Sequence, residues 1–281
     1  MELIEIIDEN IADFEDYISV DLQSDLERSF FYGLGAAEKD GTPLGAMVYE
    51  LLDYDSDEDT KSRIHSFEVK NDEAAKLLMS AYKDRVSEED VVESSYETKD
   101  EKLNGYMKSA GFESGECESP EIVLTMGDVK KMTSMVAGKK LPPYIQSLKE
   151  VSLVSYRDFI KNCLGKGRYG LLEDLAYLPL GFFERDVSSC SMADGKVDGV
   201  FLVRKTPSGA IHACFFTAFG ADYQKNLGLL MMHAALKVTE LYQDDVRVVI
   251  RRHNDNVKRL TDKFFPNIKG EEICCGRRKE S

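Results

Sequence analysis

Residues 211–228 contain the side chains best suited to chemistry. His212 is the only histidine in an apolar stretch that runs from Ile211 to Phe216. An imidazole titrates near neutral pH, so His212 could act as a general base. The alternative is a strand histidine that is hydrogen-bonded to its neighbours. Tyr223 follows, and it is the nearest phenol in the sequence that could donate a proton. His212 and Tyr223 are therefore the candidate catalytic residues.

The segment from Ala218 to Gly228 could connect a strand to the N-terminus of a helix. If Ala218 ends a strand, the residues up to Gly228 lead from that strand into a helix. Consecutive backbone N–H groups at a helix N-terminus bind phosphate, and small residues let the backbone approach closely. The alternative is a plain strand-to-helix connection in which Gly228 serves packing. The other residues predicted at this turn are Tyr223, Gln224, Lys225, Asn226 and Leu227.

No pattern of metal ligands stands out elsewhere in the sequence. Six cysteines occur and none forms a C-x-x-C pair, so no metal site is predicted. The acidic stretch Asp53–Asp59 lacks the glycine and the distant glutamate of an EF-hand loop, and it is interpreted as a solvated loop. Scattered cysteines, an acidic N-terminus and the lack of a long apolar run favour a cytoplasmic protein without a membrane span.

The formal net charge of −15 bears on the choice of partner. A negative field repels a phosphate backbone, which argues against nucleic acid, and it attracts a cationic amine. Solubility alone is the alternative explanation of the acidity. Nothing in the sequence predicts an oligomeric state.

Two copies of one hairpin pattern indicate an internal repeat. Asp40–Gly45 and Asp194–Gly199 both read D-G-x-x-x-G, and both precede an apolar strand. Asp-Gly supplies the positive φ that a hairpin turn needs. Each hairpin is followed by strand, helix, strand and helix, and on this alignment His65 has the position of His212. A strand–helix–strand unit beside a hairpin gives a mixed sheet, so the predicted fold class is α/β, or α+β by some conventions.

A stretch rich in lysine, glycine and proline separates the two halves. Residues Gly138–Pro143 read G-K-K-L-P-P, a composition typical of a stiff boundary. We predict a first domain over 1–126, closed by a strand at Glu121–Met126. A linker over 127–146 and a second domain over 147–281 follow.

The order of elements in both halves resembles the GNAT superfamily of acyl-CoA-dependent N-acetyltransferases. In that family a hairpin precedes a long strand, and a turn of the form R/Q-x-x-G-x-G/A opens a helix that holds the pyrophosphate of acetyl-CoA. The resemblance implies two tandem GNAT-like units, each a twisted mixed sheet flanked by helices. It also implies that acetyl-CoA binds, as co-substrate, in the second unit.

In the second half the turn matches the family in length. Asn226 and Gly228 take its two small positions, Tyr223 stands where the family has Arg or Gln, and Lys225 adds a positive charge. Asn254 matches the first residue of a later family segment, N-x-x-A-x-x-L-Y. The co-substrate contacts that the resemblance implies are Ala218, Tyr223, Gln224, Lys225, Asn226, Leu227, Gly228 and Asn254.

Two departures from the family limit the expected activity. In the first half Asp72 and Glu73 occupy the helix start and satisfy its positive end, so we predict that this half binds no co-substrate. The family's tyrosine, which protonates the departing thiolate, is replaced by Met107 in the first half and by Thr261 in the second. A threonine hydroxyl is far less acidic than a phenol.

The resemblance implies an acyl-CoA-dependent N-acetyltransferase that acts on an unidentified amine by direct transfer. The rival interpretation is a non-catalytic tandem GNAT-like protein that binds a ligand or a partner. Loss of the tyrosine in both halves favours the rival, and the turn of the second half favours the enzyme. The sequence predicts neither the acceptor amine nor the acyl group.

Overall fold

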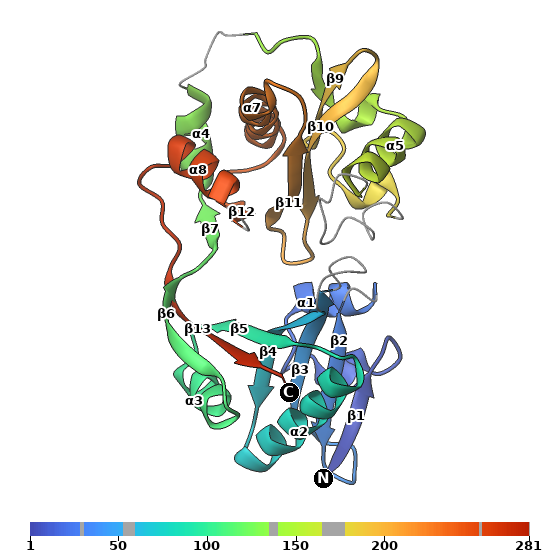
Figure 1. The fold of residues 1–281 in the computed structure, drawn as a ribbon, viewed down its shortest axis with the longest axis vertical. Coiled ribbons are helices and arrows are strands. Elements are labelled where there is room, and N and C mark those ends of the chain that lie inside the picture. Colours follow the sequence, from blue (N-terminus) through green and yellow to red (C-terminus); the bar gives the residue numbers. More distant parts are fainter. Residues whose placement is uncertain (29–30, 53–59, 135–139, 165–177, 253–254, 281) are drawn as a thin grey trace. The chain divides into compact units, whose positions relative to one another are not determined.

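The computed structural model divides the chain into two compact units (Figure 1). The structure describes every residue except 29–30, 53–59, 135–139, 165–177, 253–254 and 281. Unit 1 consists of Met1–Ser119 together with Glu272–Ser281, and unit 2 consists of Pro120–Glu271. Each unit is built on one mixed sheet with helices packed on both faces, which confirms the predicted α/β class.

A seven-stranded sheet with the order β1-β2-β3-β4-β5-β13-β6 forms the centre of unit 1. Among its described strands, β4 and β5 are the parallel neighbours. Leu78 and Tyr82 of α2 pack on one face, and Phe14 and Leu26 belong to the cluster on the other. The elements are β1 (Glu2–Ile6), η1 (Ile11–Phe14), α1 (Val20–Leu26), β2 (Tyr32–Ala37), β3 (Pro43–Leu52), β4 (Lys61–Val69), α2 (Asp72–Glu88), β5 (Glu93–Thr98), α3 (Glu101–Ser109), β6 (Glu113–Glu118) and β13 (Glu272–Lys279).

Unit 2 contains a six-stranded sheet with the order β7-β12-β11-β10-β9-β8. Here β11 and β12 are the parallel neighbours. Leu230 and Val238 of α7 pack on one face, and Tyr156 and Phe159 of α5 belong to the cluster on the other (Figure 1). The elements are β7 (Glu121–Leu124), α4 (Met126–Ser134), β8 (Ile145–Ser147), η2 (Leu148–Glu150), α5 (Leu153–Leu164), η3 (Leu180–Phe182), β9 (Ser189–Ala193), β10 (Lys196–Lys205), β11 (Ile211–Ala218), α7 (Tyr223–Leu241), β12 (Val248–Arg251) and α8 (Asp255–Phe264).

The two units exchange a strand along the chain. β7 follows unit 1 in the sequence but pairs with β12 in the sheet of unit 2. β13 follows unit 2 but lies between β5 and β6 in the sheet of unit 1. The prediction that a strand at Glu121–Met126 closes the first domain is therefore wrong, because an apolar strand shows no preference for one sheet edge in its sequence. The compact units also differ from predicted boundaries at 126 and 147, and α4 occupies part of the predicted linker.

Both repeated hairpins are present as predicted. Gly41 and Gly195 have φ of +89° and +75° at the turns, which explains the first glycine of each motif. A Cβ on the second glycine would meet the end of the next strand. It would lie 2.7 Å from the Glu68 carbonyl oxygen in the case of Gly45, and 2.9 Å from the Ala218 Cβ in the case of Gly199. The first glycine of D-G-x-x-x-G is thus required by its backbone conformation, and the second by the lack of space for a side chain.

The helices also bear on membrane insertion. No helix in the part of the chain that the structure describes combines the length and the apolar character that crossing a bilayer requires.

Candidate functional site

The parallel strands of unit 2 are paired over a short length and then part. Ile211, His212 and Ala213 of β11 pair with residues 248–250 of β12. β11 continues for five residues beyond Ala213, to Ala218, and none of the described residues of β12 pairs with that part. β4 and β5 behave in the same way in unit 1, where pairing ends at Ile64 and β4 continues to Val69. Each sheet therefore opens between its two parallel strands.

A β-bulge lies at each point where the strands part. On β11, Phe215 pairs with Leu202 and Ala213 pairs with Val203, so Cys214 is the extra residue. On β4 the pairing skips His65 in the same way. His65 therefore corresponds to Cys214 and not, as predicted, to His212, because His65 is the bulge residue of β4 whereas His212 lies two residues before the bulge of β11. Nothing in the sequence around Cys214 marked it as more than a small core residue, since a bulge depends on the partner strand.

The bulge of unit 1 carries a compact charged group. The same oxygen, Oε1 of Glu50, lies 3.1 Å from Nη1 of Arg63 and 3.1 Å from Nε2 of His65. The contact to Arg63 has the geometry of a hydrogen bond, and that to His65 does not. Phe31 stacks on the imidazole with ring centroids 4.3 Å apart. The arrangement covers His65, so this bulge is filled by the unit's own side chains.

Helix α7 begins earlier than the sequence indicated. Its first residue is Tyr223, after an N-cap at Asp222, whereas a start near Gly228 was predicted. The backbone N–H of Asn226 already donates to the Asp222 carbonyl at 2.9 Å. Asn226, Leu227 and Gly228 are therefore inside the helix, and the N–H groups without an intrahelical acceptor are those of Tyr223, Gln224 and Lys225. Gly220, with φ of +85°, and the N-cap residue Asp222 are the sequence signals that mark this start.

The predicted small positions of the turn serve packing. Asn226 is 8% exposed, and its Oδ1 accepts a hydrogen bond from Tyr144 Oη at 3.4 Å. A Cβ on Gly228 would lie 3.6 Å from Cζ of Phe264 in α8, an ordinary contact between two helices. Ala218 is buried opposite Gly199. Whether these residues contact a co-substrate remains a prediction, and Asn254 lies outside the described residues.

The start of α7 is open, in contrast to the start of α2 in unit 1. Among the described residues no side chain caps α7 at Asp222, its first turn has no acid, and Lys225 is exposed. In α2, Oδ1 of Asn71 accepts the Ala74 N–H at 2.9 Å. Asp72 stands in its first turn and accepts a hydrogen bond from Tyr106 Oη at 2.5 Å. The positive end of α2 is thus satisfied by its own unit, and that of α7 is available to an anion.

The two candidate catalytic residues are not brought together. His212 is the second residue of β11, two residues from the bulge, and pairs with Arg204 across the sheet. Tyr223 lies beyond the other end of the strand, where its oxygen accepts a hydrogen bond from Nε2 of Gln224 at 3.1 Å. From Cys214 to Ala218 alone the strand rises about 13 Å. His212 is therefore close to the bulge, whereas Tyr223 lies at the N-terminus of α7.

The positions that correspond to the family's acid are buried and satisfied. Oγ1 of Thr261 donates to backbone carbonyls of its own helix at 2.9 and 3.0 Å, and the residue is 1% exposed. Met107 is fully buried in the core of unit 1. One phenol that the sequence did not single out, Tyr156 of α5, is buried in the cluster on the same face of the sheet as Phe215. Burial raises its pKa, with smaller contributions from Cys163 and Cys214, so it stays protonated.

Known proteins resemble this chain in structure. No family model and no curated protein matches the sequence. Among solved structures, a tandem GNAT protein from the clavulanic acid biosynthesis pathway superposes with a TM-score of 0.65 at 10% identity, over 100% of this chain and 98% of that one. The chain has a tandem GNAT fold.

Two further solved structures superpose on nearly the whole of this chain. A putative acetyltransferase from Pyrococcus horikoshii superposes with a TM-score of 0.55 at 13% identity, over 100% of this chain and 89% of that one. A GCN5-related glucosamine N-acetyltransferase region of a fungal multi-domain β-N-acetylglucosaminidase gives a TM-score of 0.64 at 10% identity, over 99% of this chain and 38% of that one. At these identities the likeness concerns the fold alone.

Proposed function

We propose that unit 2 is an acyl-CoA-dependent N-acyltransferase and that unit 1 binds no co-substrate. The observation that carries the proposal is the uncapped N-terminus of α7 next to the parted strands β11 and β12. The N–H groups of Tyr223, Gln224 and Lys225 would hold the pyrophosphate of acetyl-CoA, with the lysine charge beside them. The pantetheine arm would then run into the opening between the strands, toward the bulge at Cys214. The satisfied start of α2 supports the assignment of the site to unit 2.

The chemistry would take place near the bulge. The amine nitrogen attacks the thioester carbonyl carbon, the C–N bond forms, and the C–S bond breaks with its electron pair leaving on sulfur. His212, two residues from the bulge, would accept the amine proton directly or through water. A backbone N–H at the bulge would polarise the carbonyl. A thiolate is a fair leaving group, so loss of the family's acid would slow the reaction by about 10²–10⁴-fold without abolishing it.

The solved structures support this proposal at the level of the fold. Three of the proteins with this fold are described as acetyltransferases or as a tandem GNAT protein. The acidic composition of the chain supports a cationic amine as acceptor.

Changing Gln224 to Glu tests the site at α7. The substitution keeps the shape of the side chain and adds a negative charge in the first turn, so it should favour the helix by about 0.3–1 kcal/mol and repel a phosphate there. We expect binding of CoA, followed by calorimetry, to weaken about tenfold. Gln243→Glu makes the same chemical change beyond the other end of α7 and should leave binding unchanged. Equal loss in both variants, or none in Gln224→Glu, would place the anion elsewhere.

A non-catalytic ligand-binding protein is the second candidate function. The observation that favours it is the buried, satisfied Thr261 at the position of the family's acid. The two candidates separate when amines such as polyamines, aminoglycosides and amino-terminal peptides are screened for release of free CoA thiol, with His212→Ala as the control. CoA binding without release on any amine would favour the ligand-binding protein.

A further inference from the structure

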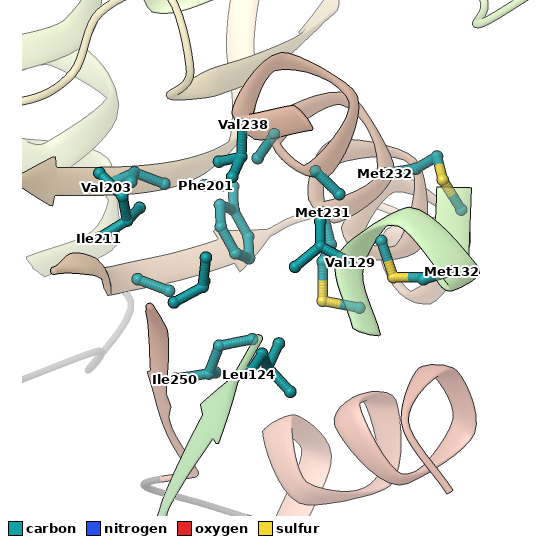
Figure 2. Close-up of a cluster of buried hydrophobic side chains, with 14 of the residues drawn as sticks. Leu124, Val129, Met132, Phe201, Val203, Ile211, Met231, Met232, Val238 and Ile250 are labelled. Carbon is teal, nitrogen blue, oxygen red and sulfur yellow. The ribbon is translucent and has the colours of Figure 1, made fainter. Parts of the chain in front are cut away.

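An apolar cavity lies in the core of unit 2, against the paired stretch of β11 and β12, and it reaches the point where these strands part. Its volume is about 30 Å³, and every residue that lines it is apolar. Ala213 of β11 and Ile250 of β12, which form the last pair before these strands part, both belong to its wall. Figure 2 shows side chains from β7, β10, β12 and α7 converging here, among them Leu124, Phe201 and Val238.

The lining makes the cavity unsuitable for water. A buried water needs about two to four polar partners, and apolar cavities of this kind stay dry and take up hydrocarbon. About 10–15 Å³ of such space holds one water-sized group, so about 30 Å³ holds two. The cavity therefore suits a short saturated chain of about two carbon atoms.

Small and flexible side chains give the cavity its room. Ala213 from β11 and Ala234 and Ala235 from α7 have no atoms beyond Cβ to fill it. Met132 and Met231 also belong to the lining, and methionine adapts its shape more readily than branched residues. The wall can thus yield to a guest slightly larger than the empty space.

The cavity is next to the proposed site of chemistry. Ala213, in its wall, directly precedes the bulge residue Cys214 along β11. The helix that covers it, α7, is the one whose start would hold the pyrophosphate. The cavity lies on the face of the sheet that α7 covers. The acyl carbons of a thioester bound at the bulge would be next to Ala213 and Ile250, where the two strands part.

We infer that unit 2 prefers acyl donors of three to four carbons, propionyl-CoA and butyryl-CoA, over acetyl-CoA. This inference rests on the proposed function of unit 2. Each added methylene that enters the cavity should tighten binding about fourfold, the equivalent of about 0.8 kcal/mol per buried CH₂. Affinity should stop rising when the chain exceeds the cavity.

The test is competition of CoA, acetyl-CoA, propionyl-CoA, butyryl-CoA and octanoyl-CoA for the full chain, measured by calorimetry. We expect affinity to rise from acetyl to butyryl by about sixteenfold, which is fourfold for each of the two added methylenes, and to fall for octanoyl. Equal affinity for all four thioesters, or a steady fall from acetyl onward, would overturn the inference while leaving the proposed function intact. No binding of CoA or any thioester would overturn both.

Two variants assign the preference to the cavity. Ala235→Leu fills it and should remove the advantage of butyryl over acetyl, whereas Val238→Ala enlarges it and should shift the optimum to a longer chain. Binding of free CoA, which has no acyl group, should be the same in both variants and in the parent, and it reports that they are folded. A butyryl preference unchanged in both folded variants would place the acyl group outside this cavity.

Discussion

Gly276 of β13 lies directly beneath the ring of Tyr96 on β5. A Cβ at this glycine would be 2.4 Å from Cε1 of the tyrosine, which is closer than real Cβ atoms approach. The ring is buried, and its hydroxyl donates to Oδ1 of Asn104 at 2.5 Å, so it has no free direction in which to move. The absence of a side chain at Gly276 is therefore what lets β13 enter the sheet of unit 1.

We expect Gly276→Ala to lower the free energy of unfolding by about 1–3 kcal/mol, as overpacking of a well-packed core does. Gly115→Ala is the matched control, because Gly115 lies in the neighbouring strand β6 and a Cβ there meets nothing within 4 Å. Urea unfolding followed by circular dichroism measures both. Similar stabilities of the two variants would show that the ring yields to the added carbon.

Arg278 and Arg277 offer a second matched pair in β13. The guanidinium of Arg278 donates to the Ala110 carbonyl at 3.2 Å and to Glu280 at 2.6 Å, and its side chain is 10% exposed. The Arg277 side chain is 76% exposed, with a 4.0 Å contact to Glu93. Arg278→Ala should cost about 2 kcal/mol of stability, because it leaves buried polar groups unpaired. Arg277→Ala should change the free energy of unfolding by less than about 0.5 kcal/mol. Equal losses in urea unfolding would refute this account of β13.

His233 of α7 gives the stability of the protein a pH dependence. Burial lowers its pKa below the ordinary value of 6.5, and the nearby Lys237 lowers it further. Its Nδ1 is buried and has no hydrogen-bond partner among the described residues. The unfolded chain then binds a proton more readily than the folded one, so this contribution is present above about pH 6.5 and lost as the pH falls below it. The free energy of unfolding should decrease between pH 7.5 and 5.5 by less in His233→Leu than in the parent. Identical slopes would mean that His233 titrates normally.

Gly228 should tolerate a methyl group. The residue lies inside α7, its φ is not positive, and the nearest contact of an added Cβ is 3.6 Å from Phe264. Gly228→Ala should therefore stabilise the helix by about 0.5–1 kcal/mol and leave CoA binding unchanged. Thermal unfolding and calorimetry measure the two effects. A large loss of CoA affinity would show that the backbone at Gly228 approaches the co-substrate, as the sequence first indicated.

Local signals account for what the sequence predicted correctly. The Asp-Gly pairs at residues 40 and 194 form hairpin turns through their own backbone preferences. β11 begins with the apolar stretch Ile211–Phe216 and ends at Ala218, as the sequence indicates, because turn residues stand on both sides of it. The spacing of the family motif predicts the start of α7 near Gly228, five residues after the observed start at Tyr223, because that motif does not take account of the N-cap residue Asp222.

Features that depend on distant parts of the chain could not be predicted. The bulge at Cys214 is one extra residue of β11 relative to β10. It depends on how the two strands pair, and the sequence of either strand alone does not encode it. The partner of β7 is decided by which sheet edge is free, and the sequence of a short apolar strand is compatible with either. The cavity depends on how side chains from six helices and strands meet, so the sequence around Ala213 and Ala235 does not indicate it.

The exchange of β7 and β13 has a consequence for the order in which the protein can fold as it is synthesised. Unit 1 is made first, but its sheet has a gap between β5 and β6 until residue 279 has left the ribosome. Until then two strand edges are open, and such edges pair readily with other chains. The acidic side chains of β6, at residues 113, 116 and 118, would discourage that pairing. In the completed sheet Arg277 of β13 lies opposite Glu113, whereas Glu116 lies opposite Cys274. Unit 1 is thus translated before unit 2, but its sheet is completed only after unit 2 has been synthesised.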